Sequence, residues 1–234
     1  YFKTIGLDAQ LIDARELIVT DDNFGNALVN FEETDKRIRK YFSRTDKLIV
    51  MGGFIAATIN NETTTLGRGG SDYTASIVAA ALQAKLLEIW TDVDGMMTAD
   101  PRKVRRTMVL KQLSYIEALE LSHFGAKVLY PPSVQPVLAK SIPLKIKNTF
   151  NPAAEGTLVA RESVDNGSPI KGISSIDTVA LISLNGSGMV GVSGFAKRLF
   201  SALAAGRINV ILITQASSEH SITVAINTAD AIKA

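Results

Sequence analysis

The sequence predicts an α/β protein, with a large layered domain whose mainly parallel sheet carries helices on both faces and a smaller β-rich domain after it. Short β-rich runs alternate with longer helical patterns along the first part of the chain. A polar segment at 163–172, rich in turn formers, then separates two regions with different patterns. The composition of the 234 residues, 46% hydrophobic with no Cys, excludes disordered, collagenous and disulfide-stapled chains.

The first domain is expected to span residues 1–162. Its predicted strands are Ala9–Ile12, Lys47–Met51, Leu86–Thr91 and Pro143–Lys147. Its predicted helices are Glu32–Phe42, Tyr73–Ala84, Ser114–Leu121 and Ser133–Lys140, of which the second is apolar on almost every side. Because helices that connect parallel strands pack on the faces of the sheet, this alternation indicates a layered domain.

Residues 173–234, which follow the linker at 163–172, have a β-α-β-β pattern. The predicted elements are strands at Val179–Leu184, Asn209–Gln215 and Ser221–Asn227, a Gly-rich turn at Asn185–Gly191 and a helix at Phe195–Ala204. This order makes up three quarters of a ferredoxin-like β-α-β-β-α-β unit. The chain begins at Tyr1 rather than Met and ends at Ala234 in what resembles the start of a helix, so we expect a fragment.

The charge pattern argues against nucleic-acid and membrane partners. A formal net charge of +2 is too small for a nucleic-acid surface, and the densest basic group is Lys103, Arg105 and Arg106. No apolar run approaches the length of a membrane span, and the first residues form neither a signal nor a transit peptide, so we expect a soluble, cytoplasmic protein. His123 and His220 lie far apart without further ligands at metal spacing, which gives no support to a transition-metal site.

The segment Thr63–Asp72 (TTTLGRGGSD) is the most informative in the chain. Its three glycines permit positive φ and close backbone approach, and Ser71 and Asp72 are expected to cap the helix that follows. Backbone N–H groups and the fork of Arg68 would then face an anion such as a carboxylate or phosphate. An ordinary Gly-rich loop with a capping Ser and a solvent-facing Arg is the alternative. The segment matches neither the Rossmann nor the P-loop pattern.

Polar residues also gather in three other segments. Glu88–Arg102 (EIWTDVDGMMTADPR) places hydroxyl and carboxylate groups at the end of a strand, where open α/β sheets bind ligands such as a nucleotide with Mg²⁺. A solvated loop is the alternative. Lys127, within Phe124–Pro132 (FGAKVLYPP), could reach a phosphate or lie on solvated surface. The paired glycines of Met51–Phe54 (MGGF) fit a further loop of the site or close packing.

Taken together, GRGGSD, WTDVDG followed by TADPR, FGAKVLYP and ITQASSEHSI resemble the motifs of aspartokinases, in the family's order. Tyr1 to about Arg161 resembles the later part of an amino-acid kinase domain, with its carbamate kinase-like fold, and Ile173 onward resembles the first part of the regulatory ACT region. The run QASSEHSI is most similar to aspartokinases fused to homoserine dehydrogenase. Against this resemblance, another kinase of the same fold, such as glutamate or uridylate kinase, is disfavoured.

The resemblance implies phosphoryl transfer from MgATP to the β-carboxylate of L-aspartate, which gives 4-phospho-L-aspartate, the entry step to lysine, threonine and methionine. By resemblance, aspartate is held by Arg68 and Ser71, with Phe54 and Gly69 lining its pocket and Asp72 organising the reacting centre. The implied ATP-binding residues are Thr91, Asp92, Arg102 and Lys127. This chemistry depends on positioning and charge neutralisation, and the aspartate carboxylate is already anionic, so no general base is required.

The chain departs from the family pattern at Met97, where Tyr is common, and at Tyr130, where His is common. The family's phosphate-binding Lys and its substrate-binding Glu have no counterpart in these 234 residues, so we expect the fragment to be weakly active or inactive. An amino-acid-sensing module with a degenerate kinase domain is the alternative function.

The ACT resemblance implies feedback control by an amino acid and homo-oligomers formed through the ACT domains. We expect threonine rather than lysine as the effector, because Ile211 offers no counter-charge to a lysine ammonium. Gln215 provides an amide donor and acceptor for the threonine side chain, supported by backbone groups near Met189. A strand end without a ligand is the alternative for Gln215.

Overall fold

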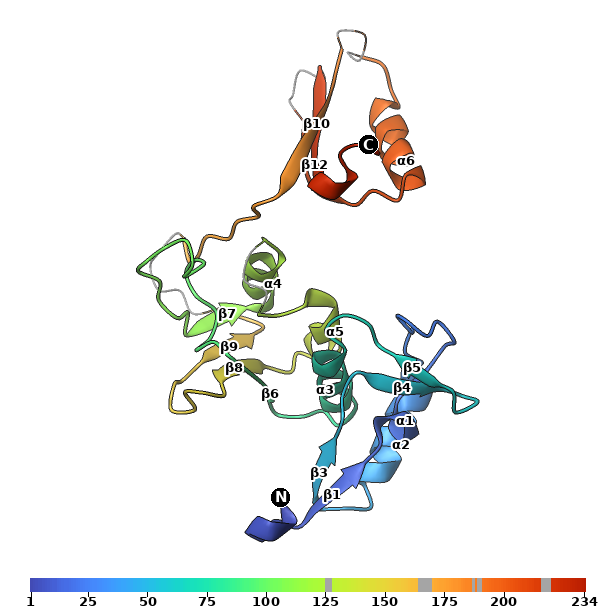
Figure 1. Cartoon of the computed structure of the whole chain (residues 1–234), viewed down its shortest axis with the longest axis vertical. Helices are drawn as coiled ribbons and strands as arrows, with labels where there is room; N and C mark the ends of the chain where they lie inside the picture. Colours follow the sequence, from blue (N-terminus) through green and yellow to red (C-terminus); the bar gives the residue numbers. More distant parts are fainter. Residues whose placement is uncertain (125–127, 164–169, 187, 189–190, 216–219) are drawn as a thin grey trace. The chain divides into compact units, whose positions relative to one another are not determined.

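The computed structural model describes residues 1–124, 128–163, 170–186, 188, 191–215 and 220–234. Within these ranges the chain forms two compact units, Tyr1–Ser175 and Ile176–Ala234 (Figure 1). Each unit has a hydrophobic core of its own. Residues 170–175, which include the end of the predicted linker, belong to the first unit.

The first unit contains every strand and helix that the sequence predicts for it. Its strands are β1 (Ala9–Ile12), β2 (Val19–Thr20), β3 (Leu48–Met51), β4 (Ile55–Thr58), β5 (Thr63–Thr65), β6 (Leu87–Thr91), β7 (Gln112–Ser114), β8 (Leu144–Asn148) and β9 (Thr157–Ala160). Its helices are α1 (Ala14–Leu17), α2 (Phe31–Phe42), α3 (Gly70–Ala81), α4 (Tyr115–Phe124) and α5 (Pro131–Ala139), after a 3-10 turn at Lys3–Ile5. The elements that the sequence did not predict, namely α1, β2, β4, β5, β7 and β9, are too short to show periodicity. No helix among the described residues is long and apolar enough to cross a membrane.

The strands form three sheets rather than the one sheet expected from the sequence. β1 pairs with β3, β4 lies between β2 and β5, and the third sheet has the order β6-β8-β9-β7. All of these pairs are parallel except β4–β5 and β8–β9. β3 and β4 fall in different sheets because Gly52–Phe54 turns the chain between them, with Phe54 at φ +78. The mainly parallel, layered α/β class is therefore confirmed. The expectation of one continuous sheet is wrong, because the strands of the first unit form three sheets.

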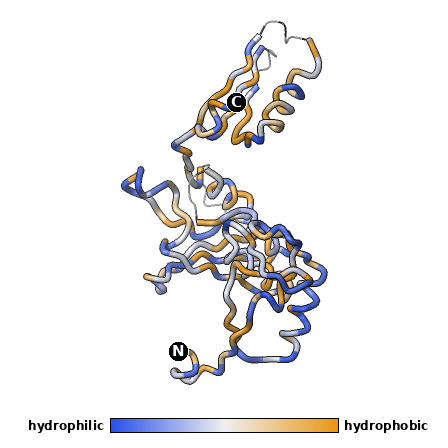
Figure 2. The backbone as a smooth tube through the Cα atoms, turned by 45° about the vertical axis from the view of Figure 1, so that its right-hand side comes forward, coloured by the Kyte–Doolittle hydropathy of each residue, from blue (hydrophilic) through white to orange (hydrophobic). Residues whose placement is uncertain are grey.

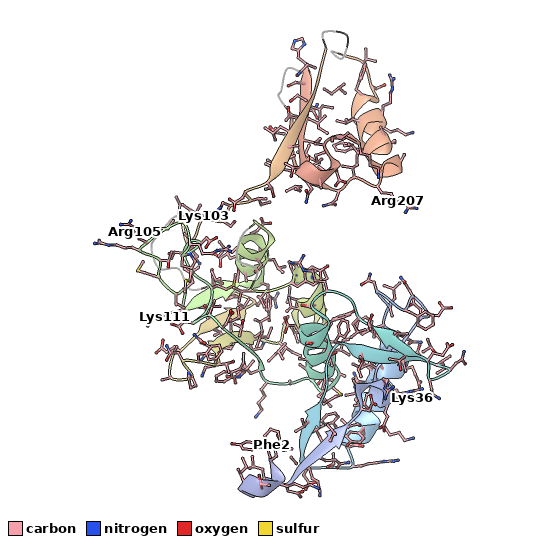
Figure 3. All side chains as sticks on the ribbon, viewed as in Figure 1. Phe2, Lys36, Lys103, Arg105, Lys111 and Arg207 are labelled. Carbon is pink, nitrogen blue, oxygen red and sulfur yellow. The ribbon has the colours of Figure 1, made fainter. Side chains whose placement is uncertain are left out.

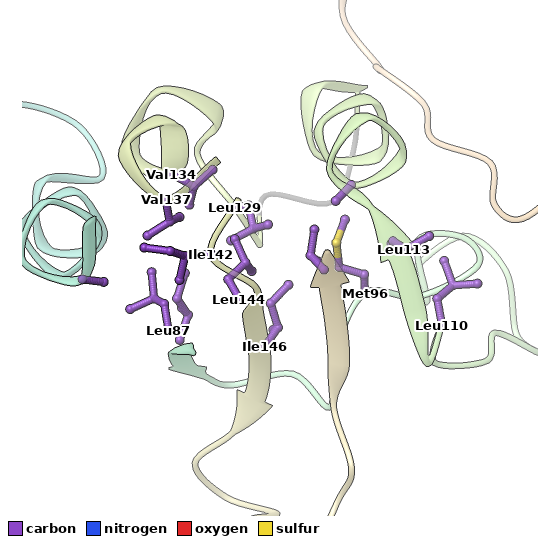
Figure 4. Close-up of a cluster of buried hydrophobic side chains, with 14 residues drawn as sticks. Leu87, Met96, Leu110, Leu113, Leu129, Val134, Val137, Ile142, Leu144 and Ile146 are labelled. Atoms are coloured by element: carbon purple, nitrogen blue, oxygen red, sulfur yellow. The ribbon is translucent and has the colours of Figure 1, made fainter. Parts of the chain in front are cut away.

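The larger core of the first unit lies between the β6-β8-β9-β7 sheet and the helices α3, α4 and α5 (Figure 4). Leu87 and Ile89 of β6 and Leu144 and Ile146 of β8 are buried in it, in the alternate positions that share one face of a sheet. This packing fixes the position of β6. The last residue of β6, Thr91, is one of the predicted ligand-binding residues.

Helix α3 is shared by two cores. Ala79 packs in the core with β6 and β8, whereas Ile77 and Ala81 pack in a second core with residues of α1, α2 and β4. The strand β3, which is hydrophobic along its whole length (Figure 2), borders this second core. A helix buried on both sides must be apolar nearly all round, which explains its sequence pattern.

Helix α3 begins at Gly70, three residues before its predicted start, and this corrects the expected cap. The N-cap is Gly69, at φ +70, and no side chain caps the helix. Ser71 and Asp72 therefore lie in the first turn. A left-handed glycine turns the chain directly into the helix, so the cap position is filled without a hydroxyl or carboxylate.

The second unit has the predicted β-α-β-β order. Its elements are β10 (Val179–Asn185), α6 (Phe195–Ala205), β11 (Val210–Gln215) and β12 (Ser221–Asn227). The strands form an antiparallel sheet of order β10-β12-β11, and Leu203 of α6 packs with Ile222, Val224 and Ile226 of β12. Where the sequence predicts the start of a helix, the chain forms a short 3-10 turn, Thr228–Asp230.

Candidate functional site

Two glycine-containing loops meet at the start of α3. The N–H of Phe54 donates to Thr74 Oγ1 of α3 at 3.0 Å. A Cβ on Gly70 would lie 2.8 Å from Phe54 Cδ2, and a Cβ on Gly53 would lie 2.9 Å from Ser71 Cα. Any side chain at either glycine would push the loops apart, so glycine is required for this contact. The motifs MGGF and GRGGSD therefore lie in direct contact at the start of α3.

Arg68 stands between two glycines in the left-handed region, Gly67 at φ +72 and Gly69 at φ +70. Its side chain is exposed, and its Cζ lies 5.2 Å from the centre of the Tyr130 ring. No carboxylate of the described residues forms an ion pair with Arg68. The N–H groups of the guanidinium are therefore available to an anionic ligand.

Asp72 lies half-buried in the first turn of α3. Burial raises the pKa of its carboxyl group above the ordinary value of 3.8. Ser71 is exposed at the same end of the helix. The start of α3 therefore brings together a guanidinium, a hydroxyl and a partly desolvated carboxyl group.

The second group of site residues lies at the end of β6. Thr91 Oγ1 donates to Asp92 Oδ1 at 3.1 Å, and the carbonyl of Thr91 accepts from the N–H of Thr149 at 2.8 Å. Residues 82–86 alone join α3 to β6. The two groups of predicted site residues therefore belong to consecutive elements of the fold.

Asp94 is held by two asparagines, Asn148 at the end of β8 and Asn151 in the turn after it. Its Oδ1 accepts from the side-chain amides of Asn148 at 2.7 Å and Asn151 at 3.2 Å. These bonds tie the loop after β6 to the end of β8. Neither asparagine is among the site residues predicted from the sequence, although the run NTFN directly after a predicted strand was the signal that could have identified them.

Arg102 lies in the loop between β6 and β7 and forms an ion pair with Asp100. Its Nε, Nη2 and backbone N–H donate to the Asp100 carboxylate at 3.0, 2.8 and 2.9 Å. These hydrogen bonds lower the pKa of Asp100 to about 2. Lys103 and Arg105 project from the same loop (Figure 3). An anionic ligand must therefore compete with Asp100 for the guanidinium.

Residues 170–175, which we call the connector, bind this loop. The N–H of Ile173 donates to the carbonyl of Thr98 at 2.8 Å, and Lys103 Nζ donates to Ser175 Oγ at 2.8 Å. Ser175 is the last residue of the first unit. The connector is thus attached to the same loop that carries Arg102.

The predicted effector residues belong to the second unit. Gln215, at the end of β11, lines a cavity of about 340 Å³ together with residues 191–196 and Ile222. The cavity includes the start of α6. Ile211 is the extra residue of a β-bulge, since the register shifts between its two neighbours.

The structure therefore divides the predicted site residues into separate groups. Phe54, Arg68, Gly69, Ser71 and Asp72 gather at the start of α3, Thr91 and Asp92 lie at the end of β6, Arg102 lies in the loop that follows, and Gln215 and Ile211 lie in the second unit. Lys127 and Met189 lie outside the described residues. Within the described ranges, no three His, Asp or Glu side chains are grouped so that they could hold a metal ion.

Comparison with known families gives two matches along the chain. Residues 1–148 match the amino acid kinase family, and residues 182–234 match an ACT domain. The predicted α/β class and the resemblance of the C-terminal part to ACT domains are both confirmed.

Individual relatives are aspartokinases. The chain is 46% identical over 228 residues to bifunctional aspartokinase/homoserine dehydrogenase 1, chloroplastic, of Arabidopsis thaliana. The aligned region covers 94% of this chain and 25% of that protein. It is 35% identical over 224 residues to lysine-sensitive aspartokinase 3 of Escherichia coli strain K12. This alignment covers 95% of this chain and 49% of that protein. The crystal structure of E. coli aspartokinase III in complex with aspartate and ADP superposes with a TM-score of 0.80 at 34% identity, over 97% of this chain and 51% of that one. The chain thus spans about a quarter of the plant relative and about half of the bacterial one.

Proposed function

Since the chain belongs to the amino acid kinase family, we propose that the protein carrying it is an aspartate kinase. The reaction is transfer of the γ-phosphoryl group of MgATP to the β-carboxylate of L-aspartate, which gives 4-phospho-L-aspartate. The observation that carries the proposal is the exposed fork of Arg68, held on a tightly packed glycine frame beside Ser71 and Asp72. Similarity to an aspartokinase solved with aspartate and ADP supports the choice of substrates.

On the substrate side, Arg68 binds a carboxylate of aspartate through two parallel N–H···O bonds, which an ammonium cannot reproduce. Phe54 and Gly69 line the pocket, and Ser71 adds a hydroxyl donor. The attacking carboxylate is already anionic, so the site has to hold it in line with the phosphoryl group rather than remove a proton. Asp72, partly withdrawn from water, orients the reacting groups.

On the nucleotide side, we assign Thr91, Asp92, Arg102 and Lys127. Mg²⁺ bound to phosphates keeps several waters and takes one or two protein carboxylates, so Asp92 would be a suitable protein ligand without a larger acidic cluster. When bound, Mg²⁺ neutralises charge on the phosphates. The Thr91 hydroxyl holds the Asp92 carboxylate, and Arg102 supplies positive charge to the phosphates after it releases Asp100.

A coupled ADP-release assay on the polypeptide that contains this chain tests the proposal. We expect ADP release that depends on L-aspartate, with an acyl phosphate product that hydroxylamine converts to a hydroxamate. Arg68→Lys should raise the aspartate KM about tenfold or more, whereas Lys36→Arg, a change at an exposed cation of α2, should leave it unaltered. Binding of an amino acid effector without any aspartate-dependent turnover would favour a sensing module with a degenerate kinase domain.

We also propose that threonine binds in the second unit and regulates the kinase, and that the ACT domains associate between copies of the protein. The cavity beside Gln215 supports this site, because N–H groups at the start of α6 suit a carboxylate and the Gln215 amide suits a hydroxyl group. Ile211 offers no counter-charge to a lysine side chain. Calorimetric titration with each amino acid tests the choice. A micromolar lysine site without a threonine response, or unchanged threonine inhibition in Gln215→Ala, would contradict it.

A further inference from the structure

Tyr130 lies where two segments that are distant in sequence come together, the loop before α3 and the start of α5. The Cζ atom of Arg68 is 5.2 Å from the centre of the Tyr130 ring. A Cβ on Gly69 would lie 2.8 Å from Tyr130 Cδ1 and 3.0 Å from its Cβ, so the ring occupies the space that Gly69 leaves free. Arg68 and Gly69 therefore share the same aromatic neighbour.

The backbone of Tyr130 is firmly held. It is the N-cap residue of α5, with extended dihedrals (φ −93, ψ 111), and two prolines follow it. A residue before proline is largely restricted to this region. Its carbonyl accepts from the N–H of Ser133 at 2.9 Å and from Ser133 Oγ at 2.7 Å, and Ser133 is buried. The ring thus starts from a fixed point, whereas the long side chain of Arg68 is exposed.

We propose that Tyr130 is a positioning residue that holds the Arg68 guanidinium in its substrate-binding orientation, an inference that rests on the proposed role of Arg68 in binding aspartate. The negative face of the ring attracts the cation, and this contact uses none of the N–H donors that a carboxylate needs. Without the ring, an exposed arginine between two glycines occupies many rotamers. Fixing one of them on binding then costs more conformational entropy.

The proposal requires the aromatic ring and not the hydroxyl group. Tyr130→Phe keeps the ring and should leave the aspartate KM within about twofold of the wild-type value. Tyr130→Leu keeps an apolar contact with Gly69 but removes the π system, and it should raise the aspartate KM about three- to tenfold. The ATP KM and kcat should each change less than about twofold in both variants, because the ring contacts the arginine that is proposed to bind aspartate. A defect in folding would not produce this split.

A double-mutant cycle with Arg68→Gln, which removes the cation, gives the decisive comparison. In that background, Tyr130→Leu should change the aspartate KM less than about twofold, because no guanidinium is left to position. Equal effects in both backgrounds, or equal effects of Tyr130→Phe and Tyr130→Leu in the wild-type background, would overturn the proposal.

The two proposals can fail separately. If the wild-type polypeptide shows no aspartate-dependent turnover, the proposed function is wrong. Urea unfolding of the wild type, Tyr130→Leu, Arg68→Gln and the double variant then tests the contact between Arg68 and Tyr130 without substrate. We expect Tyr130→Leu to lower the unfolding midpoint more when Arg68 is present than in Arg68→Gln. Equal shifts would show that the ring does not hold the guanidinium.

Discussion

Arg68 and Arg102 are both exposed arginines on loops of the first unit, but the structure holds them in opposite ways. Arg68 lies on a backbone defined by steric contact, with Gly69 packed against Tyr130 and Gly70 against Phe54. Arg102 is held by the carboxylate of Asp100, two residues before it. A close-packed backbone resists displacement, whereas an ion pair whose guanidinium lies largely in solvent exchanges readily. The first arrangement suits recognition of a small substrate by shape. The second suits a ligand whose negative charge can displace Asp100 from the guanidinium.

Breaking the packed frame should have the largest effect. Gly69→Ala places a Cβ 2.8 Å from Tyr130 Cδ1 at a φ of +70. We expect the aspartate KM to rise more than about tenfold, together with a loss of about 1–2 kcal/mol or more of unfolding free energy. Gly6→Ala is the matched control, since Gly6 has a φ of +83 but nothing within 4 Å of its added Cβ. It should lower stability without changing KM, and an unchanged KM in Gly69→Ala would show that the frame is not rigid.

Asp72→Asn separates the chemistry of the packed loop from its stability. Because burial raises the pKa of Asp72, the folded state binds this proton more tightly than the unfolded state, so the group lowers stability as pH rises from about 3.8 through the raised pKa. We expect the variant to keep or gain thermal stability at pH 7 while kcat falls about tenfold. Calorimetry and steady-state kinetics measure both. Wild-type kcat in a stable variant would remove Asp72 from the reacting centre.

Asp100→Ala probes the other arginine. The change removes both the ion pair to Arg102 and the carboxylate that accepts its backbone N–H. We expect the ATP KM to fall about three- to fivefold, because the phosphates no longer compete with Asp100 for the guanidinium. The aspartate KM and Tm should stay nearly constant, because the guanidinium lies largely in solvent and such pairs contribute little to stability. Glu155→Ala, which breaks an exposed ion pair to Lys111, is the control. A change in the aspartate KM as large as that in the ATP KM would contradict the division between the two loops, and a higher ATP KM would contradict the competition with Asp100.

The smallest effect should appear in acid, at the contact between the connector and α4. Lys171 Nζ lies 2.9 Å from Glu117 Oε1. Burial raises the pKa of Glu117, but hydrogen bonds from the Ser114 N–H and Lys171 outweigh it and bring the pKa to about 2. A lowered carboxyl pKa contributes stability that is fully present above the ordinary value of 4.5 and is lost as pH falls towards 2. Between pH 7 and pH 3, Glu117→Gln should therefore lose less Tm than the wild type, and parallel losses would exclude this contribution.

The sequence predicted the long elements and the motif loops because their signals are local. The strand pattern of β6, the all-round apolar pattern of α3 and the glycines around Arg68 can each be interpreted from neighbouring residues. The division of the sheet could not be predicted, because it depends on a positive φ at Phe54, which a bulky residue rarely adopts.

Contacts between distant segments were also beyond the sequence analysis. Tyr130 is visible in the sequence only as a departure from a motif, since nothing near it in the chain indicates that its ring packs on Gly69. Likewise, Asn148 and Asn151 acquire a role only once β8 lies beside β6 and brings them to Asp94. The start of α3 was misplaced for a related reason, because a glycine cap lacks the side-chain signal of the usual cap residues.

The attachment of the connector has a mechanical consequence. A pulling force applied at Ile176, where the second unit begins, is borne first by the bonds from Lys103 to Ser175 and from Ile173 to Thr98. Residues 101–106 of the loop are exposed and make no core contacts, so they yield to the load before the buried strand β6 does. The load therefore reaches the loop that carries Arg102 before it reaches the core of the first unit.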